Sequence, residues 1–418
     1  MKARFAMVLA LATATASAGD WKEFRGSNAQ GHAEGTNLPT HWTDTENVLW
    51  KTPIAGLGWS SPVVLEDRVF LTSAVSEKGA LAPTQSLRAL CINLKDGTTT
   101  WDIEVFSQES VSPAVDKIHG KNSQASPTPI TDGKHVFVHF GTRGTACLTL
   151  DGKIVWKTQE LKYQPVHGNG GSPVLFKGLL IISCDGGDRA FIAALERDSG
   201  KIRWQHDRSV KPAAKKFAFG TPLLIDVGGQ MQLISQGAGA VYGYRPEDGQ
   251  EIWQARYGDG YSVIPRPVFA HGLLYVGTGY DQAKLIAVDP TGKGDVTETH
   301  IKWTMTRGAP HTPSPLVVGD ELYVVSDKGI ATCLNAKTGE QIWQERLGGN
   351  YSSSPLFADG KIYLQSEEGE SIIIKPGTTY SEIARNKLEP RTFASHAVVG
   401  SSLLVRTEKN LYRIGNKK

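Results

Sequence analysis

Tryptophan recurs along this 418-residue chain at intervals of 40 to 55 residues, and no other pattern narrows the choice of fold as far. Most of these residues close a Gly-x-x-x-Trp motif, as in Gly200-Lys-Ile-Arg-Trp204 and Gly339-Glu-Gln-Ile-Trp343. The seven tryptophans are Trp50, Trp101, Trp156, Trp204, Trp253, Trp303 and Trp343. A period of about fifty residues indicates one repetitive body rather than two or three unrelated domains.

The repeated unit reads as four short strands joined by tight turns. In the copy at residues 313–343, the segments 314–318, 321–326, 330–334 and 340–343 are apolar or β-branched, and Gly or Asp residues separate them. Short runs of this kind with Gly-containing turns predict antiparallel hairpins. A small sheet of four strands buries both faces only when neighbouring sheets cover it, so the repeat predicts an all-β fold, a β-propeller.

The number of first strands predicts eight blades. They open near Ser61, Ser126, Ser172, Thr221, Arg266, Ser314, Ser354 and Ser395. The eighth copy ends at residues 411–415 without a Trp strand, whereas residues 48–54 form a Trp strand with no earlier strands before it. We therefore expect this N-terminal strand to complete the last blade and close the ring over residues 48–415. Residues 19–47 precede the ring as an extended arm, on its outside or across one face.

The repeats resemble a known family. Gly-x-x-x-Trp motifs with Ser-Pro openings are similar to the pyrroloquinoline-quinone (PQQ) type propeller repeats shared by quinoprotein dehydrogenases and by the BamB type of outer-membrane assembly lipoprotein. The opening Trp21-x-x-Phe24-Arg25-Gly26 and the later Val48-Leu-Trp50 also resemble exported BamB-like propellers. The resemblance covers essentially the whole mature chain. It implies the fold and leaves the function open.

The first eighteen residues have the order of a secretory signal. Lys2 and Arg4 precede an apolar run that ends in Ala16-Ser17-Ala18, so we expect cleavage near Ala18 and a periplasmic or secreted protein. The run is too short to span a bilayer. Without these residues the formal charge is 43 minus 42, or +1, and the basic residues are dispersed, which predicts no nucleic-acid partner and no transmembrane segment.

The four cysteines are predicted to be buried free thiols. Cys91, Cys147 and Cys333 occupy one repeat position, where Ala194 stands in another copy. Equivalent positions in different blades are too far apart for a disulfide, which requires Cα atoms within about 7 Å. No C-x-x-C motif is present, so zinc and haem sites of that kind are not expected.

One face of the propeller is predicted to carry the long polar loops. They include the connections Phe106 to Gln124, Tyr163 to Gly171 and Asp207 to Phe217, and the turns Ser73 to Ser86 and Cys184 to Arg189. We call this the loop-rich face, and long loops in compact folds are usually functional. Residues just before the first strands should converge at its mouth. The candidate ligand-binding residues are Trp59, Asn122, His167, Asn169, Tyr261, Arg266, His311, Tyr351, Arg391 and His396, with Asn350 beside them.

The chemistry of these candidates leaves several uses open. Histidines, a tyrosine and arginines around one pore suit an anionic sugar or carboxylate, or acid and base catalysis, and they equally suit hydrogen bonding between blades and to ordered water. Acidic residues in turns, among them Asp185, Asp188, Asp327 and Glu367, are interpreted as solvated, because a calcium site needs at least about six oxygens. No metal site is predicted.

The two branches of the resembling family imply different functions. A quinoprotein dehydrogenase carries a catalytic Asp, a calcium ion and often a vicinal disulfide beside the quinone, and this chain has no Cys-Cys pair. The BamB type is anchored through a Cys at the cleavage site, and Ala18-Gly19-Asp20 offers none, so no lipid anchor is predicted. We interpret the chain as an exported binding or scaffold module with no cofactor and with a protein or glycan partner on the loop-rich face. The alternative is an enzyme that uses the mouth, either a quinoprotein oxidoreductase with PQQ and calcium or a sugar-processing lyase.

Overall fold

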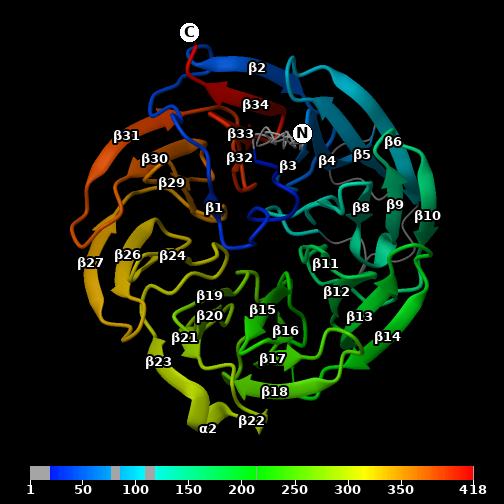
Figure 1. Ribbon diagram of the computed structural model, residues 1–418, viewed down its shortest axis with the longest axis vertical. Helices are drawn as coiled ribbons and strands as arrows, with labels where there is room; N and C mark the ends of the chain where they lie inside the picture. Colours follow the sequence, from blue (N-terminus) through cyan, green and yellow to red (C-terminus); the bar gives the residue numbers. More distant parts are fainter. Residues whose placement is uncertain (1–18, 77–84, 109–117, 213, 418) are drawn as a thin grey trace, which may run out of the picture.

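The structure is a computed structural model that describes residues 19–76, 85–108, 118–212 and 214–417. Eight antiparallel sheets stand in a ring around a central axis, and the chain follows the ring in sequence order (Figure 1). The predicted eight-bladed all-β propeller is confirmed. The predicted signal segment, residues 1–18, lies outside the described residues.

Each of the first four blades carries four consecutive strands, the innermost first. Blade 1 holds β3 (Val63–Leu65), β4 (Arg68–Val75), β5 (Gln85–Asn93) and β6 (Thr99–Gln108). Blade 2 holds β7 (Ile130–Thr131), β8 (His135–His139), β9 (Thr145–Thr149) and β10 (Ile154–Thr158), with a 3-10 turn at Gly141–Arg143. Blade 3 holds β11 (Val174–Phe176), β12 (Leu179–Asp185), β13 (Ala190–Glu196) and β14 (Ile202–Asp207). Blade 4 holds β15 (Leu223–Val227), β16 (Gln230–Gln236), β17 (Ala240–Tyr244) and β18 (Glu251–Arg256), and β22 (Gly294–Asp295) extends its edge.

The remaining blades follow the same plan, with additions from the N-terminal residues. Blade 5 holds β19 (Val268–Ala270), β20 (Leu273–Gly277), β21 (Leu285–Val288) and β23 (Ile301–Met305), with the short helix α2 (Thr297–His300) before β23. Blade 6 holds β24 (Leu316–Val318), β25 (Glu321–Val325), β26 (Ile330–Asn335) and β27 (Gln341–Arg346). Blade 7 holds β28 (Leu356–Ala358), β29 (Lys361–Gln365), β30 (Glu370–Ile374) and β31 (Glu382–Lys387), with β1 (His32–Ala33) beside β28. Blade 8 holds β32 (Ala397–Val399), β33 (Ser402–Arg406), β34 (Asn410–Gly415) and β2 (Val48–Pro53).

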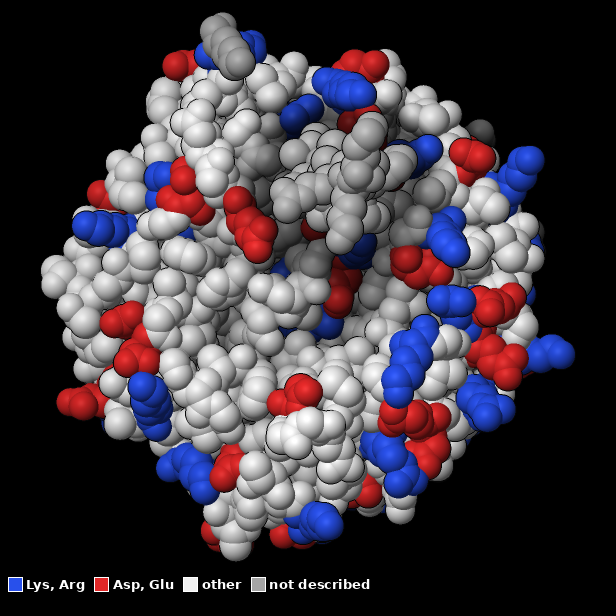
Figure 2. Space-filling model, viewed as in Figure 1, with Lys and Arg blue, Asp and Glu red and all other residues white. Residues whose placement is uncertain are grey.

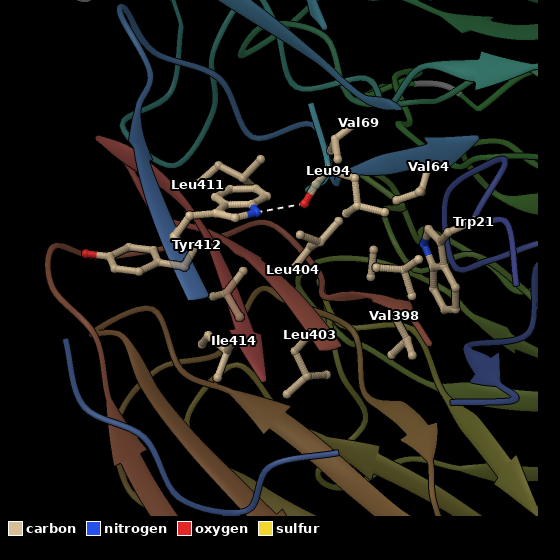
Figure 3. Close-up of a cluster of buried hydrophobic side chains, with 14 of the residues drawn as sticks. Trp21, Val64, Val69, Leu94, Val398, Leu403, Leu404, Leu411, Tyr412 and Ile414 are labelled. Carbon is tan, nitrogen blue, oxygen red and sulfur yellow. Dashed lines mark hydrogen bonds between the residues drawn. The ribbon is translucent and has the colours of Figure 1, made fainter. Parts of the chain in front are cut away.

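The N-terminal strand closes the ring as predicted. β2 pairs antiparallel with β34, from Val48 opposite Ile414 to Pro53 opposite Asn410. Trp50 then links this last blade to the first one, because its indole Nε1 donates a hydrogen bond of 2.8 Å to the Leu94 carbonyl (Figure 3). The cluster around this contact joins buried side chains of the arm, the first blade and the last blades. Closure therefore depends on residues from both ends of the chain.

The Gly-x-x-x-Trp motif is a contact between blades. Trp303 in blade 5 donates its indole N–H to the Ala336 carbonyl at 3.1 Å, in the turn before the last strand of blade 6. Gly339 in that turn has a φ of +75°, and a Cβ atom there would lie 2.6 Å from the Trp303 ring. Trp50, Trp101, Trp156 and Trp343 make the same hydrogen bond to the following blade. Glycine is needed because it adopts a positive φ and leaves room for the indole ring.

The cysteine position of the repeat faces the tryptophan strand. Cys91, Cys147 and Cys333 stand opposite Trp101, Trp156 and Trp343 in the neighbouring strands, and Ala194 stands opposite Trp204. A small side chain at this position leaves space for the indole in a close-packed interior. All four cysteines of the chain are buried and free, as predicted. Burial raises their pKa values, to about 11 for Cys91.

The N-terminal arm crosses one end of the channel. Trp21 pairs with Val64 in blade 1, and β1 lies parallel to β28 in blade 7. The arm backbone and side chains reach Glu66 and Asp359, which lie beside the turns between first and second strands. These turns lie at the opposite end of the blades from the loop-rich face. The blue N-terminal ribbon accordingly runs over the centre of the ring (Figure 1).

Two of the predicted long loops are shorter than expected. β4 extends to Val75 and β5 begins at Gln85, so both ends of the predicted turn from Ser73 to Ser86 belong to strands. β6 likewise extends to Gln108. These strands continue the hairpin beyond the usual blade because residues such as Leu87 and Phe106 still find buried neighbours. The centres of both predicted loops, residues 77–84 and 109–117, lie outside the described residues.

Candidate functional site

A pocket of about 260 Å³ lies on the propeller axis. Its walls come from the connections that enter each blade and, at Tyr280, from a turn between a second and a third strand, which places it toward the loop-rich face. The residues that line it are Phe24, Trp59, Ser61, His119, Lys121, Asn122, Ser126, Thr128, His167, Gly170, Ser172, Phe219, Thr221, Tyr261, Ser262, Ile264, Tyr280, Thr312, Ser314, Ser352, Ser354, Phe393 and Ser395. The volume is slightly below the range of about 300–1,000 Å³ for small-molecule sites.

A ring of hydroxyl groups surrounds the lower part of the pocket. Each hydroxyl stands just before a first strand and accepts a hydrogen bond of 2.9–3.2 Å from a backbone N–H of the preceding blade. The members of this hydroxyl ring are Ser61, Thr128, Ser172, Thr221, Ser314, Ser354 and Ser395. The predicted opening of blade 2 at Ser126 is corrected to Thr128, because the Thr128-Pro129 pair directly precedes β7.

Arg266 takes the position of the eighth hydroxyl and connects the ring to the arm. Its backbone N–H donates to Ser314, whereas its side chain is 1% exposed and turns toward the arm. The guanidinium donates to Glu23 Oε2 at 2.9 Å and to the Phe24 carbonyl at 2.6 Å. Phe24 is thereby held in the lining of the pocket. The arm therefore contributes Phe24 to the lining of the pocket from the face opposite the long loops.

Aromatic rings form the upper wall of the pocket. Trp59 and Phe393 meet edge to face with ring centres 4.5 Å apart. His119 and His167 are 5.6 Å apart, and the Tyr280 ring lies 4.7 Å from His311. Such pairs are stabilised beyond their burial and hold the rings in fixed orientations. The wall thus offers fixed apolar surfaces for the body of a ligand.

Ion pairs join different blades around the mouth. Lys121, in the connection to blade 2, reaches Glu367 in blade 7 at 2.7 Å, and Ser352 also donates to this carboxylate at 2.6 Å. His311 lies 3.4 Å from Asp327. Burial opposes the charge on Asp327, but hydrogen bonds from His311 and Thr312 outweigh it and lower the pKa of this carboxyl group.

Two further ion pairs lie at the rim. Lys215 contacts Asp281 at 2.8 Å, and Arg391 contacts Glu408 at 3.2 Å. The hydrogen bond from Lys215 lowers the pKa of Asp281. Figure 2 draws the opposite face, over which the N-terminal arm runs in Figure 1, and there basic and acidic side chains are intermixed around the perimeter.

Six of the ten candidate residues lie in or beside the pocket. Trp59, Asn122, His167 and Tyr261 line it. His311 packs on the lining residue Tyr280, and the Arg391 guanidinium lies 5.9 Å from the Trp59 ring and 5.4 Å from that of Phe393. Asn350 lies farther out, where its side chain donates to Glu368.

The structure places the other four candidates outside the lining of the pocket. Asn169 is buried and donates to Gln124 and to the Phe140 carbonyl, and Tyr351 is buried in the core between blades 6 and 7. Arg266 holds the arm, as described above. His396 is 2% exposed, its Nε2 lies 3.0 Å from Gln365 Oε1, and burial lowers its pKa to about 4. His396 follows Ser395 of the hydroxyl ring by one residue, whereas Asn169 and Tyr351 precede Ser172 and Ser354 by three residues. Their side chains, like that of Arg266 at the ring position itself, turn away from the pocket into contacts with neighbouring elements.

Sequence reasoning missed several lining residues. Tyr280 follows the second strand of blade 5, and aligning the second-to-third turns across repeats would have found it. Thr312, Ser352 and Phe393 each lie two residues before a member of the hydroxyl ring. Phe24 could not be found by aligning repeats, because it lies in the arm before the first repeat and the repeat pattern does not predict the path of the arm.

Asp185 is a correction to the interpretation of turn acids as solvated. It ends β12, is 3% exposed and binds the Arg208 guanidinium through two hydrogen bonds of 2.9 and 2.8 Å. Arg208 also donates to Ser235 and Tyr244 in blade 4. Because β12 extends to Asp185, the carboxylate lies between blades 3 and 4, and it serves as a contact between them.

Comparison with known proteins places the chain in a family. The family model described as outer membrane protein assembly factor BamB matches residues 33–158, 91–315 and 295–379, which together span more than half of the chain. The chain belongs to the BamB-like family. The BamB protein of Alkalilimnicola ehrlichii is 30% identical over 148 residues, 34% of this chain and 37% of that protein. The BamB protein of Moranella endobia is 23% identical over 297 residues, 69% of this chain and 66% of that protein.

Similarity to solved structures supports the fold. BamB from Moraxella catarrhalis superposes with a TM-score of 0.62 at 15% identity, covering 89% of this chain and 97% of that one. Quinohemoprotein alcohol dehydrogenase from Comamonas testosteroni gives 0.67 at 11% identity, covering 96% and 82%. At such identities the likeness shows the architecture only. The matches to the first three curated relatives span between 24% and 48% of those proteins.

The described residues do not fit a calcium-bound quinone, the group that the quinoprotein branch implies. Calcium takes six to eight oxygen ligands, usually with several carboxylates. The described part of the chain contains no cluster of three His, Cys, Asp or Glu side chains that suits a metal ion. The Glu367 carboxylate at the mouth is already bonded to Lys121 and Ser352. The four thiols lie in separate strands, one each in β5, β9, β12 and β26.

Among the described residues, no helix has the length and apolar character needed to cross a bilayer.

Proposed function

We propose that this BamB-like propeller is an exported binding module whose loop-rich face receives a protein partner. The observation that carries the proposal is the axial pocket, whose walls come from the connections that enter every blade. Arg266 and Glu23 fix Phe24 of the arm beneath the hydroxyl ring, so the pocket lies between the arm and the face where the long connections gather. A partner on that face meets a rigid frame of closed blades that carries exposed polar and aromatic groups.

The character of the loop-rich face supports a protein partner. Aromatic rings and arginines are enriched where proteins bind one another. Trp59, Phe393 and Arg391 contact one another beside the pocket, and Tyr280 lines the same pocket. The relatives are named outer membrane protein assembly factors, which supports a partner among proteins rather than glycans. The secretory order of residues 1–18 supports a periplasmic or secreted location.

Site-specific photo-crosslinking tests the proposal. A photoreactive amino acid replaces His311 at the rim of the mouth in one variant and His271 in a control variant. His271 lies at the opposite end of a blade, in the turn after β19, where it contacts the Gly319 carbonyl. Irradiation of cells that export each variant should yield a protein adduct from position 311 and none from position 271. Adducts from position 271 alone would reject the loop-rich face as the binding face.

A further inference from the structure

Six members of the hydroxyl ring have an unused hydrogen-bond donor. A hydroxyl group donates one hydrogen bond and accepts up to two. Ser354 donates to Ser314 at 3.0 Å, but the other hydroxyls only accept, each from a backbone N–H. Within the described residues, the hydroxyl hydrogens of Ser61, Thr128, Ser172, Thr221, Ser314 and Ser395 have no acceptor. Their O–H groups surround a cavity with room for a ligand.

Two buried arginines close to this ring have no ion-pair partner among the described residues. Arg406 is 2% exposed and donates to the carbonyls of Ser60 and Thr72, directly behind the Trp59 and Ser61 wall. Arg25 is also 2% exposed, and it donates to the carbonyls of Pro315 and Gln30. Burial lowers the pKa of each to about 9, so both remain charged at neutral pH.

The charge around the pocket is therefore positive in balance. The pairs Lys121 with Glu367 and Arg266 with Glu23 each contain one positive and one negative side chain, and Asp327 beside His311 adds one carboxylate. Arg25 and Arg406 add two positive charges, which exceed that one carboxylate. Walls of low dielectric constant focus such a field into a cavity and raise the local concentration of anions. Unpaired buried charge is also costly, so an anion nearby would stabilise the protein.

We propose that the axial pocket binds a carboxylate attached to a compact body. The carboxylate accepts the hydroxyl hydrogens of the ring and the remaining N–H donors of Lys121, and the body lies against the aromatic wall that includes Trp59 and Tyr261. A cavity of about 260 Å³ accommodates a small organic acid or the last residue of a polypeptide. The small organic acid and the polypeptide end both present a carboxylate. The inference rests on the proposed function, because the pocket lies on the face that is proposed to bind the partner.

Matched charged and uncharged probes test this inference on the purified mature protein. D-glucuronate is compared with D-glucose, and N-acetylleucine is compared with its amide. N-acetylleucine mimics the end of a polypeptide chain. Binding is measured by calorimetric titration at constant ionic strength. We expect saturable binding of at least one acid and none of its uncharged counterpart, and the acid that binds identifies the source. Equal binding within both pairs, or binding of neither acid, would overturn the proposal.

Two pairs of variants locate the binding on the pocket. Thr128→Val removes one hydroxyl of the ring, whereas Thr128→Ser retains it. Lys121→Met removes the ammonium group at the mouth, whereas Lys162→Met removes an exposed charge in the connection that enters blade 3, outside the lining. Thr128→Val and Lys121→Met should each weaken binding by about tenfold or more, because each removes a hydrogen bond in which a charged group takes part. Unchanged affinity in Lys121→Met would contradict the proposal even if Thr128→Val did not fold.

The outcome separates this inference from the proposed function. Loss of acid binding together with continued crosslinking from position 311 would reject the carboxylate site and keep the protein-binding face. Acid binding without any crosslink from position 311 would keep the carboxylate site and reject the protein-binding face.

Discussion

Asp185 and Arg208 lie buried against each other where the third and fourth blades meet, and they test how much a single ion pair contributes to this fold. Arg208→Met leaves a buried carboxylate without its cation, so the free energy of unfolding should fall by about 3–5 kcal/mol. Denaturant unfolding at neutral pH measures the change. The control is Arg189→Met, whose partner Asp207 is exposed, and it should cost less than about 1 kcal/mol. Similar losses in the two variants would refute the structural role assigned to Asp185.

His396 predicts a pH dependence of stability. Its pKa in the folded protein is about 4, below the ordinary value of about 6.5 that applies in the unfolded chain. Between pH 6.5 and 4 the unfolded chain binds a proton that the folded protein does not. Stability therefore falls with falling pH in this window, by up to about 1.4 kcal/mol per pH unit from this residue.

The variant His396→Gln isolates that contribution. It should remain folded at neutral pH, since Gln365 keeps a hydrogen-bonding neighbour, and its unfolding free energy should fall less steeply between pH 6.5 and 4 than that of the parent protein. Parallel curves for the two proteins would show that His396 is not held neutral by burial.

At the scale of the strand and turn, the Gly-x-x-x-Trp motif gives a measurable prediction. Gly339→Ala places a Cβ at a φ of +75° and against the Trp303 ring, whereas Gly229→Ala places one at a φ of +85° with no atom within 4 Å. The control should lose about 1–2 kcal/mol from the backbone alone. Gly339→Ala should lose about 1–3 kcal/mol more from overpacking, as measured by denaturant unfolding. Equal losses would mean that the indole contact does not hold the blades together.

The same elements show what could be read from the sequence. The Trp spacing and the Gly turns predicted the fold, because both are local patterns that recur from blade to blade. The Trp strand missing from the eighth copy predicted closure by β2, because residues 48–54 supply the only such strand without a blade of its own. The pocket was predicted in part. Trp59 and Tyr261 were found from their position before a first strand, but His396 and Tyr351 occupy similar positions and turn into the core. Side-chain direction at a strand entry depends on the neighbouring blade, which periodicity does not encode.

At the scale of the whole molecule, the two N-terminal segments have separate roles. A variant that begins at Asn47 lacks the arm and keeps β2, so the ring remains closed and should unfold in one cooperative transition. A variant that begins at Gly56 also lacks β2, which leaves β34 as an unpaired edge. We expect this second variant to associate through that edge or to lose its single transition, as monitored by calorimetry and light scattering. Identical behaviour of the two variants would contradict closure by β2.

The binding face itself is tested most directly by hydrogen–deuterium exchange of the mature protein, alone and with the partner captured through position 311. Binding on the loop-rich face predicts slower exchange in residues 159–171, 257–266 and 306–315, which surround the mouth. The arm at residues 19–40 and the turns beside Glu66 and Asp359 should exchange at unchanged rates. Protection confined to the arm and those turns would contradict the account and place the partner on the opposite face.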